Sequence, residues 1–126
     1  MENLEINKFI PKSWGYESFV VNDKDHNICG KELFVKKGFS SSLHYHRNKT
    51  EAFRLISGGV RLFYSWDDCL KDGQIDYSLL NVQDLQPGDS FYIPVGLRHK
   101  FYGMLDSIIM EVSNYSEDSD SIRLAY

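Results

Sequence analysis

Residues 38–58 read GFSSSLHYHRNKTEAFRLISG and place two histidines, one carboxylate and two glycines at fixed spacings. His44 and His46 are two positions apart, and alternate residues of a β-strand point to the same face, so both imidazoles can meet at one point. Glu51 begins the next apolar run, and an antiparallel turn through residues 47–50 would bring it back beside the histidines. This stretch predicts two strands joined by a turn, with three potential metal ligands grouped together.

A second stretch, residues 88–99, reads GDSFYIPVGLRH and adds His99 directly after a Gly/Pro cluster. Three imidazoles and one carboxylate suit a borderline divalent metal ion such as Zn, Fe, Ni or Mn. Such a ligand set leaves positions open for water or substrate, as a catalytic site requires. An isolated His-x-His pair more often decorates an exposed strand edge, and His26, in a polar turn, is expected at the surface.

The rest of the chain is a series of short β-branched and aromatic runs separated by Gly, Pro and polar residues, which is typical of an all-β barrel or sandwich. Gly58-Gly59 between two such runs predicts a hairpin. The polar segment 65–77 is interpreted as a hairpin or loop insertion, either a lid or an ordinary surface element, and residues 67–71 offer one helical turn at most. The expected strands are 19–21, 31–35, 52–56, 60–64, 78–82, 90–93, 100–102 and 107–112.

The size and composition of the chain exclude several classes of protein. The chain has 126 residues, a formal net charge of −4 and an apolar content of 42%, which fit one globular domain covering residues 1–126. An acidic balance argues against nucleic acid or an anionic membrane as partner, because phosphate binding needs a basic face. We find no apolar run long enough to span a bilayer. The two cysteines imply no disulfide framework, and a cytoplasmic location is expected.

The spacings match two motifs, G-x5-H-x-H-x4-E-x6-G and G-x5-P-x-G-x2-H, and the chain resembles the cupin superfamily over nearly its whole length. This resemblance implies a jelly-roll barrel, also called a double-stranded β-helix, with one metal ion inside. The barrel core would cover residues 17–113, after an N-terminal lead-in strand and before an acidic tail. The resemblance also implies a homodimer. The metal ligands it implies are His44, His46, Glu51 and His99.

Three further stretches, residues 14–17, 31–47 and 117–123, are similar to phosphomannose-isomerase-type cupins, although His44 stands where many of those proteins have Gln. The implied reaction is aldose–ketose isomerisation of a sugar, sugar phosphate or nucleotide-linked sugar through a metal-stabilised enediolate. Glu51 and Glu111 are the candidate bases, although a salt bridge with Arg123 or simple exposure is the favoured interpretation of Glu111.

The candidate substrate-binding residues fall into two groups. Lys31 alternates with Glu32 and could point inward to an anionic substrate or lie in solvent. Tyr92 could offer a hydroxyl at the mouth or fill the core. Phe53 and Phe101 are expected to line an apolar pocket together with Leu55 and Leu62.

Two alternatives to the isomerase remain open at the level of sequence. The first is a mononuclear metal dioxygenase or lyase, because the same ligand set serves those reactions. The second is a non-catalytic cupin that binds a small ligand. In each case the expected partner is a small molecule, and a carbohydrate is the first choice.

Overall fold

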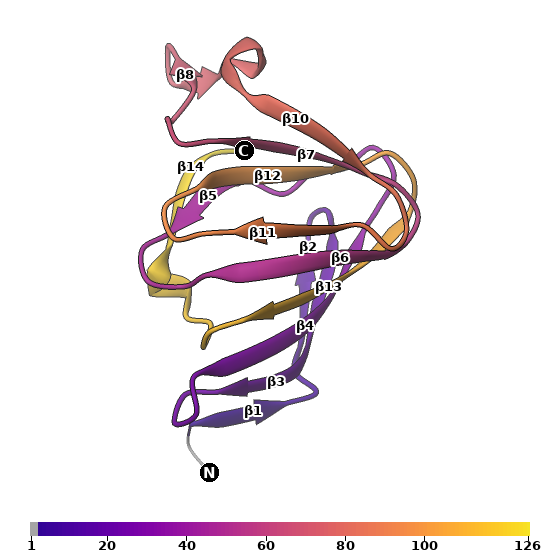
Figure 1. Ribbon diagram of the computed structural model, residues 1–126, viewed down its shortest axis with the longest axis vertical. Helices are drawn as coiled ribbons and strands as arrows, with labels where there is room; N and C mark the ends of the chain where they lie inside the picture. Colours follow the sequence, from indigo (N-terminus) through magenta and orange to yellow (C-terminus); the bar gives the residue numbers. More distant parts are fainter. Residues whose placement is uncertain (1–2) are drawn as a thin grey trace.

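The computed structural model describes residues 3–126, which form two antiparallel sheets that face each other (Figure 1). The larger sheet has the order β1-β3-β4-β13-β6-β11, with β2 also paired to β3. Its strands are β1 (Leu4–Ile6), β2 (Phe9–Lys12), β3 (Gly15–Asp23), β4 (Ile28–Val35), β6 (Glu51–Ser57), β11 (Ser90–Ile93) and β13 (Ser107–Ser113). The smaller sheet, in the order β10-β7-β12-β5-β14, contains β5 (Leu43–His46), β7 (Val60–Ser65), β10 (Asn81–Leu85), β12 (Arg98–Gly103) and β14 (Ser121–Ala125).

The predicted all-β class is confirmed. The only helical segments among residues 3–126 are two 3-10 turns, η1 (Tyr77–Leu79) and η2 (Asp118–Asp120). The helical turn allowed for residues 67–71 does not form, because Leu70 and Lys71 belong to the short strand β8. No helix of the described chain is long and apolar enough to cross a membrane.

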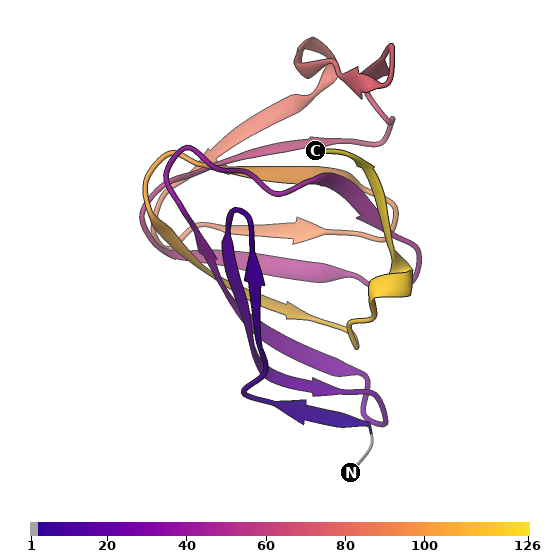
Figure 2. The same ribbon diagram turned by 180° about the vertical axis from the view of Figure 1, so that it is seen from behind.

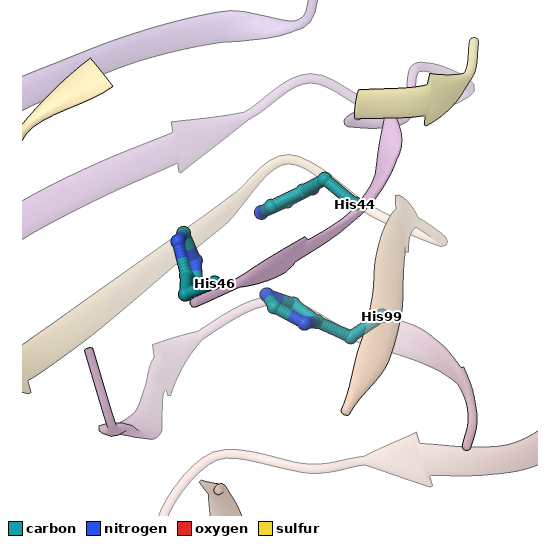
Figure 3. Close-up of side chains that lie close together, drawn as sticks. All are labelled: His44, His46 and His99. Atoms are coloured by element: carbon teal, nitrogen blue, oxygen red, sulfur yellow. The ribbon is translucent and has the colours of Figure 1, made fainter. Parts of the chain in front are cut away.

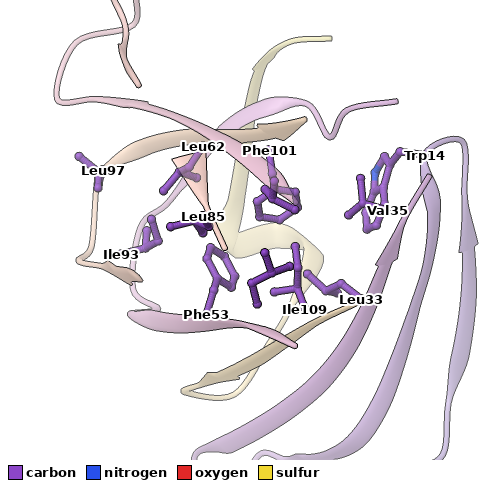
Figure 4. Close-up of a cluster of buried hydrophobic side chains, with 12 residues drawn as sticks. Trp14, Leu33, Val35, Phe53, Leu62, Leu85, Ile93, Leu97, Phe101 and Ile109 are labelled. Atoms are coloured by element: carbon purple, nitrogen blue, oxygen red, sulfur yellow. The ribbon is translucent and has the colours of Figure 1, made fainter. Parts of the chain in front are cut away.

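The core lies between the two sheets, because inward-facing apolar residues alternate with outward-facing residues along each strand. Phe53 and Phe101 come from opposite sheets and meet edge to face with their ring centroids 5.2 Å apart. Leu55 and Leu62 are fully buried, as the alternation predicted. Figure 4 shows this cluster between the sheets, with Trp14 at one end and Leu97 at the other.

Two glycine turns fix the strands around the site. Gly58 has a φ of +93°, and a Cβ there would lie 2.4 Å from the carbonyl oxygen of Asp106. Only glycine fits this β6–β7 turn without displacing backbone. The predicted hairpin does not form, because β6 belongs to the larger sheet and β7 to the smaller one, so the turn crosses between the sheets. Gly96 has a φ of +87° in the turn before β12, and its N–H donates to the carbonyl of His46 at 3.0 Å. This hydrogen bond joins the turn at Gly96, in the second motif, to the strand β5 that carries His44 and His46.

The segment 65–77 contains a small hairpin formed by β8 (Leu70–Lys71) and β9 (Gln74–Ile75), as expected for an insertion. It lies at the end of the molecule beyond β7 and β10 (Figure 1). The strand expected at 78–82 begins later, at Asn81. Asp76 accepts a hydrogen bond from the Ser78 N–H, and this cap holds residues 77–79 in the η1 turn instead.

The acidic tail packs against the barrel. Residues 121–125 form β14, which pairs antiparallel with the histidine strand β5 and places Arg123 opposite His44. Before it, Asn22 donates to the carbonyl of Ser116 at 2.9 Å and accepts from the same residue's N–H. Figure 2 shows η2 and β14 lying along the side of the barrel. The tail closes one edge of the smaller sheet.

Candidate metal centre

The three motif histidines converge on one point. His44 and His46 project from β5, and His99 projects from β12 opposite His44 in the strand register. One ligand nitrogen from each ring lies within 4.8 Å of the others, and Figure 3 shows the three rings facing one another. His99 is fully buried and His46 nearly so. The predicted grouping of these three histidines is therefore confirmed.

Backbone carbonyls set the tautomers of two of the rings. Nδ1 of His44 lies 2.9 Å from the carbonyl oxygen of Ser42, and Nδ1 of His99 lies 2.9 Å from that of Leu97. A carbonyl oxygen only accepts, so in each neutral ring Nδ1 carries the proton and Nε2 keeps its lone pair. Burial, followed by the neighbouring His99 and His46, holds the pKa of His44 well below its usual value. A neutral ring with a free Nε2 is the form that binds a metal ion.

Glu51 reaches the histidines from the opposite sheet, at the start of β6. Residues 47–50 cross from one sheet to the other, so they do not form the antiparallel turn that the sequence predicts. Its Oε1 lies 2.9 Å from Nε2 of His99 and 3.2 Å from Nε2 of His46. Burial acts to raise the pKa of Glu51, but His46, His99 and Lys49 outweigh it and hold that pKa well below its usual value. The predicted fourth ligand is thus an ionised carboxylate beside the His46 and His99 rings.

The donor set fits a divalent metal ion. Glu51 Oε1 and His99 Nε2 are buried, and neither makes a hydrogen bond of acceptable geometry within residues 3–126. Buried polar atoms normally have hydrogen-bond partners. A carboxylate oxygen and an imidazole nitrogen that have none and face the same point are suited to coordinate a metal ion. Nitrogen and carboxylate ligands of this type accept Mn, Fe, Ni or Zn. His44, His46, His99 and Glu51 would hold the ion.

Asp120, in the tail, supports the centre from behind. Its carboxylate accepts hydrogen bonds from the backbone N–H groups of Asn48 at 2.7 Å and Lys49 at 3.1 Å. The same group lies 4.0 Å from Nδ1 of His46. A carboxylate behind a ligating histidine orients its ring and raises its basicity. Asp120 therefore fixes the turn that leads to Glu51 and places a carboxylate behind the His46 ring.

A chain of alternating buried charges extends from the histidines into the barrel. Lys49 Nζ lies 3.2 Å from Glu51 and 3.3 Å from Glu111. Lys31 Nζ lies 3.9 Å from Glu111 and 3.7 Å from Glu17. Burial lowers the pKa of Lys49, but Glu111 and Glu51 outweigh it and leave that pKa raised. Burial and the Glu51 charge raise the pKa of Glu111 despite the two lysines.

These residues line a cavity of about 600 Å³ that contains all four candidate ligands. Lys31 and Glu111 are both buried in its wall, and Glu111 pairs with the two lysines rather than with Arg123. Phe53 and Phe101 also line it. Tyr92 does not, because it alternates with the inward-facing Ile93 and is 59% exposed on the outer face of β11.

Two residues of this site, Lys49 and Asp120, were not predicted from the sequence. Lys49 stands in a polar turn, where lysine is ordinarily solvated, yet it is only 4% exposed. Its position between His46 and Glu51 was the one available indication that it would lie near the ligands. Asp120 belongs to an acidic segment, and nothing in the sequence distinguishes it from Asp118 beside it.

Comparison with known proteins identifies the fold. No family model matches the chain. Over 97 residues, or 77% of its length, the chain is 29% identical to oxalate decarboxylase from Arthroderma benhamiae. It spans only 20% of that protein's length. This relative is named as a decarboxylase, so it gives no support to the isomerase prediction.

Solved structures match more completely. The capsular polysaccharide assembling protein CapF from Staphylococcus aureus matches 94% of this chain and 32% of its own, with a TM-score of 0.73 and 17% identity. Oxalate decarboxylase from Bacillus subtilis matches 94% of this chain and 30% of its own, with a TM-score of 0.72 and 19% identity. That enzyme contains Mn(II) centres.

A smaller protein matches along almost its whole length. KdgF from Halomonas sp. matches 89% of this chain and 91% of its own, with a TM-score of 0.68 and 14% identity. Two facing antiparallel sheets in the same arrangement as these proteins confirm the predicted jelly roll. The chain has the cupin fold, and its three-histidine centre is suited to one divalent metal ion.

Proposed function

We propose that this chain is a metal-dependent cupin enzyme of the lyase class that removes CO2 from a small carboxylate substrate. The observation that carries this proposal is the convergence of His44, His46, His99 and Glu51 beside a buried Lys49–Glu111 pair. The similarity to oxalate decarboxylase in both sequence and fold supports the choice of reaction. The isomerase predicted from sequence becomes the competing outcome of the test.

The charge of the cavity favours an anionic ligand. Its buried wall holds the lysines Lys31 and Lys49 and the carboxylates of Glu17, Glu51 and Glu111, with Glu17 the most exposed of the five. With Glu111 ionised these groups sum formally to one negative charge, and with Glu111 protonated they sum to zero. A bound divalent ion would make the sum positive in either case. An anionic carboxylate would then offset the charge of the cavity, whereas an uncharged sugar would leave it buried.

The protein groups can supply the proton that decarboxylation needs. A divalent ion, when bound, supplies Lewis acidity toward the substrate's oxygen atoms. Breaking the bond to the carboxylate releases CO2 and leaves its electron pair on the adjacent carbon, which must then take up a proton. Glu111 is suited to donate it, because burial raises its pKa and keeps the proton on the carboxyl group at higher pH. Lys49 stays charged beside it and stabilises the carboxylate that remains.

The test is CO2 release by protein loaded separately with Mn, Fe, Zn or Ni. The substrates are oxalate, other small mono- and dicarboxylates, and a matched set of aldoses and aldose phosphates. We expect metal-dependent CO2 release from a carboxylate, lost in Glu111→Gln while the metal remains bound. Conversion of an aldose to a ketose without CO2 release would overturn the proposal in favour of the isomerase. Oxygen consumption would indicate a dioxygenase, and no turnover on any substrate a ligand-binding cupin.

A further inference from the structure

The edge strand β14 of the smaller sheet brings an arginine to the wall of the cavity. Arg123 is the register partner of His44 on β5. Side chains of register partners lie side by side on one face of a sheet, and both of these residues line the cavity of about 600 Å³. Ser121, two positions earlier, also lines the cavity and is the partner of His46. Because Arg123 is exposed, it lies toward the mouth of the cavity, beside a candidate metal ligand.

Arg123 differs from the other basic residues of the cavity wall in its lack of a carboxylate partner. The wall also contains three lysines, and each of them forms an ion pair with a glutamate. These lysines are Lys12, Lys31 and Lys49. Outside the cavity, Arg61 and Arg98 pair with aspartates. Within residues 3–126 Arg123 forms no ion pair, so its charge is available to a ligand.

Tyr126 holds the guanidinium group without neutralising it. Nη1 of Arg123 donates to the hydroxyl oxygen of Tyr126 at 2.5 Å, and the centroid of that ring lies 4.8 Å from Cζ. A guanidinium group has several N–H donors, so most of them remain for another acceptor. Glu117 and Asp118 also line the cavity, but within residues 3–126 neither pairs with Arg123. A cation that is held in place and lacks a counter-charge is suited to bind an anion.

We propose that Arg123 binds a second anionic group of the substrate, so that the preferred substrate is a small dianion rather than a monocarboxylate. One anionic group would lie toward the histidines, and the other would accept hydrogen bonds from the guanidinium group. The planar fork of arginine matches a carboxylate or a phosphate with two parallel hydrogen bonds. This inference rests on the proposed function, because it takes the ligand of the cavity to be anionic.

The experiment is isothermal titration calorimetry of the Mn-loaded full chain with acetate, malonate and phosphonoacetate. Malonate and phosphonoacetate each add a second anionic group to the acetate unit, a carboxylate in one and a phosphonate in the other. We expect at least one of these dianions to bind about tenfold or more tightly than acetate. The dianion that binds more tightly identifies the second group as a carboxylate or a phosphate.

Variants of Arg123 separate its contribution from chelation of the metal ion by both anionic groups. Arg123→Gln should weaken binding of the preferred dianion about tenfold or more and leave acetate binding unchanged. Arg123→Lys should have a smaller effect, because an ammonium group keeps the charge but lacks the fork. The matched control is Arg54→Gln, at an exposed arginine of β6 that donates to Ser90, and it should bind all three probes like the wild type. Full metal content and unchanged acetate affinity show that a variant is folded.

Three results would overturn the role of Arg123. The first is equal affinity of the wild type for acetate and for both dianions. The second is equal affinity of the wild type and Arg123→Gln for the dianions, and the third is an equal loss for all three probes in Arg123→Gln. Binding does not depend on turnover. A chain that shows the expected binding pattern but releases no CO2 would therefore contradict the proposed reaction and leave the role of Arg123 standing.

Discussion

The ammonium group of Lys49 lies 3.3 Å from the carboxylate of Glu111, and both side chains are buried in the wall of the cavity. Lys49 also lies 3.2 Å from Glu51, so this one cation compensates two buried carboxylates. Removing one partner of a buried ion pair costs far more than the pair contributes, because the remaining charge stays desolvated.

Replacing Lys49 by Met should therefore destabilise the metal-free protein by about 3–5 kcal/mol, as expected for an unpaired buried charge. The double variant Lys49→Met/Glu111→Gln should lose less stability than the two single variants together, because one of the two carboxylates that Lys49 compensates is gone. Urea unfolding of the four proteins gives the coupling energy. Strict additivity would mean that the two groups do not interact.

Removing one ligand should abolish metal binding at this centre. His99→Ala deletes the most buried of the three rings, and we expect the protein to purify without the metal that the wild type retains. His26→Ala is the matched control, because His26 is an exposed residue whose ring lies 2.7 Å from Asp23 in a surface turn. Elemental mass spectrometry measures both. Equal metal content in the two variants would place the ion elsewhere.

Metal should also stabilise the fold, since its ligands come from both sheets. At a free concentration about a hundredfold above the dissociation constant, binding contributes about 2.7 kcal/mol. For a domain of this size that corresponds to a rise in Tm of about 10 °C. Differential scanning calorimetry with and without a chelator measures the shift. An unchanged Tm on saturation would contradict a site that joins the sheets.

Asp120 should act on metal affinity through His46 and the 47–50 turn. Asp120→Asn keeps one oxygen to accept the Asn48 N–H but loses the negative charge behind the ring. We expect metal affinity to fall by about 10–100-fold, the usual effect of losing such a supporting group. Asp118→Asn, two residues away in the same η2 turn, is the control. Equal affinities for the two variants would leave Asp120 with a purely structural role.

The stability of the metal-free protein should depend on His44 in mild acid. The pKa of His44 in the folded chain is well below the 6.5 that is usual for histidine, so below that pH the unfolded chain binds a proton that the folded chain does not. The free energy of unfolding consequently falls as the pH drops from 6.5 toward the pKa of the folded chain, and it recovers when the pH is raised back to 6.5. His44→Gln should flatten this slope in urea titrations at several pH values. If His44→Gln leaves the slope unchanged, the pH dependence of stability comes from other titratable groups.

Much of the site could be predicted because its residues obey strand geometry. The spacing of His44 and His46 placed both rings on one face. The sequence left open whether Lys31 points inward or into solvent, and the alternation of β4 turns it inward. Tyr92 shows the converse, because its neighbour Ile93 takes the inward position and leaves the tyrosine outside. Where a side chain's direction follows from the period of the strand, local sequence was sufficient.

The all-β class and the four candidate ligands could be predicted from the amino-acid sequence, because strand period and residue spacing are local properties. The pairing of the tail with β5, the placement of β6 and β7 in different sheets, the burial of Lys49 and the position of Asp120 behind His46 became known only from the folded chain. The Asp120–Lys49 bond joins residues 71 positions apart. Such a contact depends on which strands become neighbours in the sheet, and no local pattern in the chain specifies that choice.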